Sequence, residues 1–243
     1  MKICVAQYSP VKGDIAANIT RHKKWIELAV TNGADLVIFP ELSITGYEPE
    51  LAQELAVSKD DQRFDEFQNI ADSKNIAIGI GAPTRSNGSV CISMIIFQTG
   101  RPRVVYHKQY LHSSETPFFA SGRSFSGLLE AEVKVAVAIC YEISVAEHAA
   151  MANLLGAKIY VASLVESFTD IDKAHRNLSA IATKYNIPVL MSNSVGKTGN
   201  YNTAGRSAIW NGYGMLLQQL NDCNEGILIF DTGKVEASVP VLV

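Results

Sequence analysis

The sequence predicts an α/β fold, in which strands and helices alternate along the chain. Short apolar runs rich in Val and Ile are typical of buried strands, and they alternate with longer stretches whose apolar residues recur at helical spacing. Several of the apolar runs end at a reactive polar side chain. Polar residues in such positions indicate a site at the carboxyl edge of a sheet.

The first half of the chain begins with a predicted strand over Lys2–Gln7 and a predicted helix that starts at Asp14 and ends at Asn32-Gly33. A second strand runs to Pro40, and a second helix is predicted over Phe64–Lys74. Turn dipeptides at Asn87-Gly88 and Thr99-Gly100 separate the strands that follow. These strands are Ile76–Ile80, Cys91–Gln98 and Val104–Lys108.

The second half continues the alternation without repeating the sequence. A strand over Val133–Ile139 leads to Cys140 and a helix over Val145–Leu155, and a further helix is predicted over Ile171–Tyr185. Helices on one face of an apolar sheet indicate layers, and two such sheets can pack face to face. The remaining strands are predicted over Lys158–Leu164 and Pro188–Asn193, as a strand-turn-strand unit over Gly205–Leu217, and over Gly226–Phe230.

Composition favours a soluble enzyme. The chain has 243 residues, of which 47% are hydrophobic and 19% charged, with a formal net charge of -3. This length is ample for one core, and no Pro/Gly/Ser-rich linker or charge block divides it, so we expect a single domain over residues 1–243. The near-neutral charge gives no electrostatic footprint for nucleic acid or an anionic membrane, so we expect neither as a partner.

We expect the protein to work in the cytoplasm without a metal or cofactor. Met1-Lys2 leads into a strand rather than into a signal-peptide segment, and no apolar run approaches the roughly 18 residues of a membrane span. The four cysteines are widely separated, which fits reduced thiols. The CxxC, HExxH, calcium-loop, Walker and dinucleotide patterns do not occur in the sequence.

Four polar residues near predicted strand ends are candidates for catalysis: Glu41, Lys108, Glu115 and Cys140. Cys140 lies at a strand-to-helix turn, which presents its thiol close to backbone N–H donors. Taken singly, a cysteine after a strand is typical of a core, and a glutamate or lysine there is typical of a surface. It is the combination that points to a cysteine hydrolase without a catalytic histidine.

These residues lie in blocks that resemble the nitrilase superfamily of carbon-nitrogen hydrolases. The blocks are Phe39-Pro40-Glu41-Leu42 with Gly46-Tyr47, Tyr106-His107-Lys108-Gln109-Tyr110-Leu111, Glu115 with Gly122, and Ile139-Cys140-Tyr141-Glu142. Weaker matches extend the resemblance across nearly the whole chain. The resemblance implies an αββα four-layer sandwich, a homodimer in which helices of both subunits extend the layers, and hydrolysis of carbon-nitrogen bonds other than peptide bonds.

The resemblance implies that Cys140 is the nucleophile, Glu41 the general base, Lys108 the oxyanion stabiliser and Glu115 the second glutamate of the site. The chemistry independently needs these residue types. A thiol with an ordinary pKa of about 8.5 is mostly protonated at neutral pH, so its attack on a carbonyl needs a base. A water-poor pocket raises the pKa of a glutamate into a useful range and strengthens an ammonium that faces the oxyanion. The expected intermediate is a thioester on Cys140.

The expected substrate is a small amide or N-carbamoyl compound that releases ammonia. In the resembling family, tyrosine after the cysteine is frequent in amidases and carbamoylases, whereas nitrile-cleaving members commonly have tryptophan. The stretch Glu142–Glu147 lacks the arginine and the Phe-Pro pair of many amidases. Loop residues at the same strand ends are the predicted substrate contacts: Tyr47, Tyr141, Glu142 and Glu166. Two carboxylates among them favour a neutral or cationic substrate.

Other chemistries stay open at this level. The same thioester can serve nitrile hydrolysis or acyl transfer, and a silent binding module can keep these residues without activity. A Cys–His pair is a further alternative, because the chain has five histidines. His112 and His148 are nearest to the site in sequence. The other three are expected elsewhere: His22 and His175 on solvated helix faces, and His107 on the strand face turned away from the site.

Overall fold

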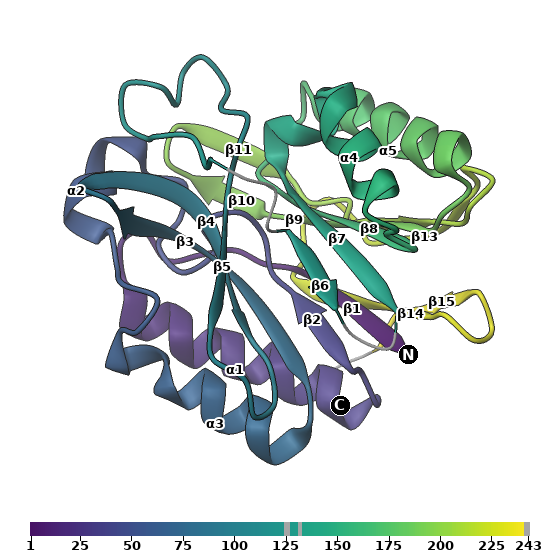
Figure 1. Ribbon diagram of the computed structural model, residues 1–243, viewed down its shortest axis with the longest axis horizontal. Coiled ribbons are helices and arrows are strands. Elements are labelled where there is room, and N and C mark those ends of the chain that lie inside the picture. The colour runs from purple at the N-terminus through teal and green to yellow at the C-terminus, as the bar shows by residue number, and fades with distance from the viewer. Residues whose placement is uncertain (124–126, 131–132, 241–243) are drawn as a thin grey trace.

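Two β-sheets form the centre of the protein in the computed structural model, which describes residues 1–123, 127–130 and 133–240 (Figure 1). The first sheet contains β1 (Lys2–Gln7), β2 (Leu36–Ile38), β3 (Ala77–Ser86), β4 (Ser89–Phe97), β5 (Val104–His107), β14 (Gly226–Asp231) and β15 (Glu236–Ser238). The second contains β6 (Leu128–Glu130), β7 (Lys134–Ile139), β8 (Ile159–Leu164), β9 (Val189–Asn193), β12 (Ala208–Trp210) and β13 (Leu216–Gln219). A separate hairpin pairs β10 (Val195–Thr198) with β11 (Tyr201–Ala204).

Helices cover the outer face of each sheet, so the molecule has four layers. Figure 1 shows α1 (Ile15–Thr31) and α3 (Asp65–Lys74) below the first sheet, and α4 (Ala146–Leu154) and α5 (Ile171–Tyr185) against the second. The strand orders are β15-β14-β1-β2-β3-β4-β5 and β13-β12-β9-β8-β7-β6. The αββα sandwich expected from the resemblance is therefore confirmed. Short helical segments complete the chain: η1 (Pro49–Leu51), α2 (Ala52–Leu55), η2 (Gln62–Phe64) and η3 (Cys140–Ser144).

The strand sequences explain the layers. Successive side chains of a strand point to opposite faces, so a strand buried on both faces reads as a continuous apolar run. In β1, Ile3 and Val5 belong to the core between the sheets, whereas Cys4 and Ala6 pack with the apolar residues of α1 and α3. Strand β7 repeats this division against α4 and α5. Both faces of each sheet therefore exclude water.

Strand directions bring several carboxyl ends to one edge of the sandwich. Strands β1, β2 and β3 are mutually parallel, as are β7, β8 and β9. Strand β5 is antiparallel to β4, which is antiparallel to β3, so β5 ends at the same edge as β2. Hydrogen bonds join the sheets at this edge: the Ser163 hydroxyl donates to the Phe39 carbonyl over 2.8 Å, and the Ser192 hydroxyl to the Ala6 carbonyl over 2.6 Å.

Most predicted elements agree with the structure, and the differences have identifiable causes. Strand β3 continues beyond Ile80 to Ser86 and turns at Asn87-Gly88, where both residues have positive φ, as a tight hairpin requires. Helix α2, strand β6 and the hairpin of β10 and β11 are too short to show a periodic signal. None of the described helices is both long enough and apolar enough to span a bilayer.

His22 corrects the expectation of a solvated helix face, because it is completely buried under the first sheet. Its Nδ1 lies 2.7 Å from the Asn18 carbonyl and its Nε2 lies 3.0 Å from the Ser43 hydroxyl. A carbonyl only accepts, so Nδ1 carries the proton and Nε2 accepts from Ser43. The Ser43 oxygen in turn accepts from the Gly81 N–H over 3.2 Å. His22 thus anchors the loop that follows β2.

Candidate active site

The loop after β2 carries Glu41 into the edge where the two sheets meet. This loop packs directly on β3, because a Cβ at Gly81 would lie 2.4 Å from the Pro40 carbonyl oxygen and the Leu42 nitrogen. Only glycine permits that approach. Lys108 follows β5 and is held there by its N–H, which donates to the Ile92 carbonyl over 2.8 Å. Two chain segments thus hold the Glu41 carboxyl group and the Lys108 ammonium in one place.

Lys108 lies between two carboxylates in a completely buried ion network. Its Nζ is 2.8 Å from Glu41 Oε1 and 2.7 Å from Glu115 Oε1, and all three side chains are at most 1% exposed. Glu115 also accepts from the Tyr47 hydroxyl over 3.0 Å and from the His112 N–H over 2.7 Å. In contrast, Glu41 Oε2 is buried and has no hydrogen-bond partner in the part of the chain that the structure describes.

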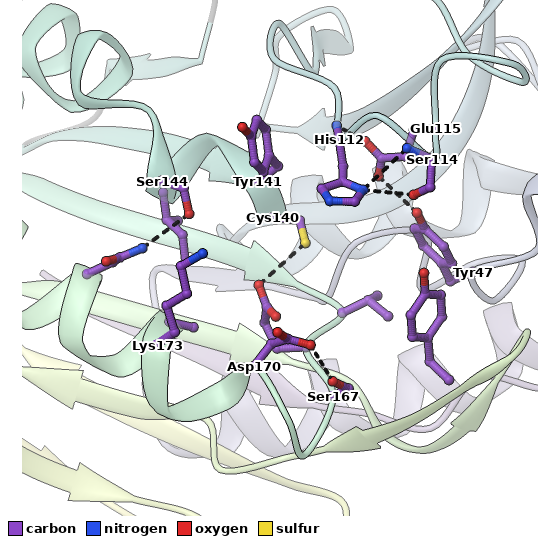
Figure 2. Close-up of a pocket in the computed structure, with 16 residues that line it drawn as sticks. Tyr47, His112, Ser114, Glu115, Cys140, Tyr141, Ser144, Ser167, Asp170 and Lys173 are labelled. Carbon is purple, nitrogen blue, oxygen red and sulfur yellow. Dashed lines mark hydrogen bonds between the residues drawn. The ribbon is translucent and has the colours of Figure 1, made fainter.

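Cys140 begins η3 directly after β7, and its backbone has a φ of 45°. This left-handed conformation is unusual for a residue other than glycine and is found at functional turns. The partly exposed thiol lies 3.8 Å from Glu166 Oε1, to which it donates a hydrogen bond (Figure 2). The sharp turn therefore presents the sulfur to a carboxylate at the end of β8.

Burial and neighbouring charges shift the pKa values of Glu41, Lys108 and Cys140. Burial raises the pKa of Glu41 to about 7, with Lys108 opposing and Glu115 adding to the rise. Burial alone would lower the pKa of Lys108, but the acidic groups around it, Glu41 foremost, outweigh that effect and raise it. The pKa of the Cys140 thiol is raised well above its ordinary value by burial, then by Glu41 and Glu166. Near neutral pH the site holds an ammonium, a thiol and a carboxyl group close to its own pKa.

A cavity of about 200 Å³ opens beside Cys140. Three of the four predicted substrate contacts, Tyr47, Tyr141 and Glu166, line it together with Cys140 and Glu115. The ring of Tyr47 meets that of Tyr201 edge to face at 5.4 Å between centroids. This volume lies below the roughly 300–1,000 Å³ of pockets for drug-sized ligands, so the cavity suits a small molecule.

Glu142 is placed differently from the expectation that it contacts substrate. It is completely buried and does not line the cavity. Its Oε2 accepts from the Ile139 N–H over 2.7 Å, and its Oε1 accepts from the Gln109 N–H and the Tyr106 hydroxyl, each over 2.7 Å. Burial raises its pKa, which these hydrogen bonds oppose. Glu142 therefore joins the residue before Cys140 to the residue after Lys108, which is a positioning contact.

The histidines do not supply the hydrogen-bond partner of the thiol, which is Glu166. His112 lines the cavity, but its Nδ1 lies 2.8 Å from the Ser114 hydroxyl. His148 is buried outside the cavity, between the hydroxyls of Tyr106 and Tyr160 at 2.9 and 2.8 Å. Burial lowers the pKa of His148 to about 4. This arrangement favours carboxylate chemistry over a Cys–His pair.

Several cavity residues were missed at the sequence level. Asp170 is the residue before α5 and Lys173 lies in the first turn of α5, and neither was among the predicted substrate contacts. Tyr201 reaches the cavity from the hairpin of β10 and β11, which is too short for a periodic pattern to predict. Among the described residues, no group of three or more His, Cys, Asp or Glu side chains is arranged to hold a metal ion.

Relatives identified by sequence share most of this chain. A family model described as carbon-nitrogen hydrolase matches residues 2–234. A hydrolase in the agr operon of Staphylococcus aureus is 28% identical over 230 residues, which cover 91% of this chain and 87% of that protein. A probable nitrilase of Schizosaccharomyces pombe is 25% identical over 236 residues, which cover 94% of this chain and 87% of that protein.

A solved structure shares the fold. A mutant of the amidase from Nesterenkonia sp. AN1, in complex with butyramide, superposes with a TM-score of 0.83 at 21% identity, covering 94% of this chain and 89% of that one. The same amidase is described as a member of the nitrilase superfamily. Because the family match spans nearly the whole sequence, the chain belongs to the carbon-nitrogen hydrolase family and is a hydrolase of carbon-nitrogen bonds other than peptide bonds.

Proposed function

We propose that this enzyme hydrolyses a small primary amide or N-carbamoyl compound through a thioester on Cys140 and releases ammonia. The observation that carries the proposal is the buried Lys108, which is held between Glu41 and Glu115 and whose charge acts on the Cys140 thiol. A variant of the Nesterenkonia amidase carries the acetamide moiety of fluoroacetamide on its active site cysteine, which supports a cysteine nucleophile here. The small cavity supports a small substrate.

The hydrogen bonds suggest different roles for the two glutamates. Both oxygens of Glu115 accept hydrogen bonds, so this carboxylate holds the ammonium of Lys108 in place. Glu41 keeps Oε2 without a partner among the described residues, and its pKa of about 7 suits a group that takes up and returns a proton. Glu41 is therefore the proposed general base.

In the proposed reaction, Glu41 takes the thiol proton as the Cys140 sulfur attacks the carbonyl carbon. The electron pair of the C=O bond moves to oxygen, which Lys108 and the Tyr141 N–H stabilise; one well-placed donor of this kind is worth about 3 kcal/mol. Glu41 then gives the proton to the amide nitrogen, the C–N bond breaks and ammonia leaves. Next, Glu41 takes a proton from water, which attacks the thioester and releases the acid while the sulfur regains its proton.

The test is ammonia release by the wild type and by Cys140→Ala from primary amides, N-carbamoyl compounds and nitriles. Release from amides or carbamoyl compounds that disappears in the variant is the expected result. Substantial hydrolysis by Cys140→Ala, with the fold intact by circular dichroism, would rule out the nucleophile. Activity on nitriles alone, or a product that depends on an added amine acceptor, would replace the amidase proposal.

We also propose that the enzyme is a homodimer that works in a reducing, cytoplasmic compartment. The free thiols of Cys4, Cys91, Cys140 and Cys223 fit such a compartment. The apolar side chains of Met151, Leu154 and Leu155 at the end of α4 are 43%, 77% and 40% exposed, which suits a surface covered by a second copy. Sedimentation should give a dimer that Leu154→Lys weakens, and a wild-type monomer at micromolar concentration would contradict the dimer.

A further inference from the structure

Glu166 is the carboxylate that faces the cavity directly beside the nucleophile. Its backbone is fixed on both sides, because its N–H donates to Asn193 Oδ1 over 2.8 Å and its carbonyl accepts from the Ala204 N–H over 2.9 Å. Its side chain is partly exposed, lines the cavity and accepts the hydrogen bond of the Cys140 thiol over 3.8 Å. A fixed carboxylate in this position meets the acyl part of any substrate that reaches the sulfur.

Asp170 places a second negative charge on the same wall. Hydrogen bonds from Ser167 and Thr169 lower its pKa, so it stays ionised near neutral pH. Burial raises the pKa of Glu166 to about 7, and the charge of Asp170 adds to the rise. The two carboxylates therefore repel each other across the cavity wall, and a cation placed beside them would relieve that repulsion.

The positive groups of the site leave this wall negative. Lys108 pairs with Glu41 and Glu115, which take two of the three N–H donors of its ammonium and balance its charge. Lys173 also lines the cavity, and its charge lowers the pKa of both Glu166 and Asp170. Its exposed side chain extends toward Ser144 in Figure 2, whereas Asp170 lies beside Ser167, so one cation faces two carboxylates on this wall. Within the part of the chain that the structure describes, no hydrogen-bond donor pairs with the buried Glu41 Oε2. This oxygen is therefore available to an N–H or O–H group of a bound ligand.

We propose, on the basis of the hydrolase activity proposed above, that the cavity selects small amides whose acyl part carries an ammonium group, and that Glu166 with Asp170 binds this ammonium. The short separation between Glu166 and the Cys140 sulfur requires a short acyl chain. The tyrosine rings of the cavity wall tolerate a cation, because the face of an aromatic ring is negative.

Ammonium binding also assists the nucleophile. Glu166 is one of the charges that disfavour the Cys140 thiolate. A cationic substrate offsets this charge at the moment when the sulfur gives up its proton, so it promotes its own attack. A neutral amide of the same shape lacks this effect. The preference for the ammonium should therefore appear in kcat/KM and not only in affinity.

The first test compares kcat/KM at about pH 8 for small amides of different charge: the isosteric pair β-alaninamide and butyramide, and the slightly larger anion succinamate. A hydrogen bond to a charged group predicts a roughly tenfold to hundredfold advantage of β-alaninamide over butyramide, with succinamate the poorest. In Glu166→Gln this ratio should fall at least fivefold, whereas Glu147→Gln on the exposed face of α4 should leave it unchanged. Equal rates for the first two amides, faster cleavage of succinamate, or an unchanged ratio in Glu166→Gln would each overturn the proposal.

A second measurement does not depend on turnover. The rates at which 2-bromoethylammonium, iodoacetamide and iodoacetate alkylate Cys140 are compared by mass spectrometry, with the exposed Cys223 as the reference in the same molecule. Glu166→Gln should slow the cationic reagent relative to iodoacetamide at Cys140 and not at Cys223. If no amide is hydrolysed but this preference is present, the proposed hydrolysis fails and the cation site stands. If amides are hydrolysed and the preference is absent, the cation site fails alone.

Discussion

Glu41 is the residue whose protonation should set the lower limb of the pH dependence. A general base acts only when ionised, and burial raises the pKa of Glu41 to about 7, so kcat/KM should rise as the pH increases through about 7. Glu41→Gln should lose at least 10²-fold in kcat, by the typical size of a general-base contribution. Rates on a neutral amide between about pH 5.5 and 8.5 check both expectations. Glu166 has a similar pKa, so Glu166→Gln is the control: a limb that vanishes there would belong to Glu166.

Lys108 is expected to be as important for folding as for catalysis. Its replacement by Met leaves Glu41 and Glu115 buried without a counter-charge, and breaking a buried pair in this way typically costs about 3–5 kcal/mol. The loss in unfolding free energy should be largest at about pH 8 and smaller near pH 5.5, where Glu41 is protonated. Urea unfolding measures it. The exposed Lys173→Met is the matched control, and an equal loss in both variants would contradict the buried network.

At the scale of elements, Glu142 connects the turn after β7 to the turn after β5. Glutamine in its place would present an amide N–H₂ to a backbone N–H of Ile139 or Gln109, which should cost about 1–3 kcal/mol. Because Cys140 and Lys108 then lose their common support, kcat should fall more than KM changes. Thermal unfolding and steady-state kinetics are the measurements, with Glu147→Gln as control. Unchanged kcat and Tm in Glu142→Gln would show that the contact does not position the site.

The elements also show what a sequence can predict. Lys108 and Cys140 follow their strands directly, and Glu41 lies three residues beyond β2, so the strand ends bring all three to one edge of the sandwich. Glu142 follows Cys140 by two residues, and its sequence position alone placed it in the pocket. Its carboxylate instead accepts hydrogen bonds from buried donors behind the turn, the Tyr106 hydroxyl and the Ile139 N–H. Sequence proximity to a nucleophile therefore does not say on which side of the turn a residue lies.

At the scale of the whole molecule, the layers were predictable and the cavity was not. Continuous apolar runs such as β1 require burial on both faces, which only a sheet between other layers provides. In contrast, Tyr201 reaches the cavity because its hairpin is fixed to other loops, for example by the Thr198 hydroxyl, which accepts from the Tyr47 N–H over 2.7 Å. Contacts of this kind join residues far apart in sequence, and no local pattern encodes them.

The buried histidines should make the whole fold sensitive to acid. Burial lowers the pKa of folded His22 from 6.5 to about 3, so between these values the unfolded chain binds the extra proton and the unfolding free energy falls as the pH falls. Between about pH 6.5 and 4.5 the wild type should lose about 2 kcal/mol more than His22→Gln, because the slope approaches 1.36 kcal/mol per pH unit only below the unfolded pKa. Glu41, whose folded pKa is raised, has the opposite effect, but it is present in both proteins and cancels.

Urea unfolding across this pH range measures the difference in unfolding free energy, and the exposed His112→Gln should run parallel to the wild type. A parallel course for His22→Gln as well would mean that His22 carries a proton in the folded protein, contrary to its role as an acceptor for Ser43.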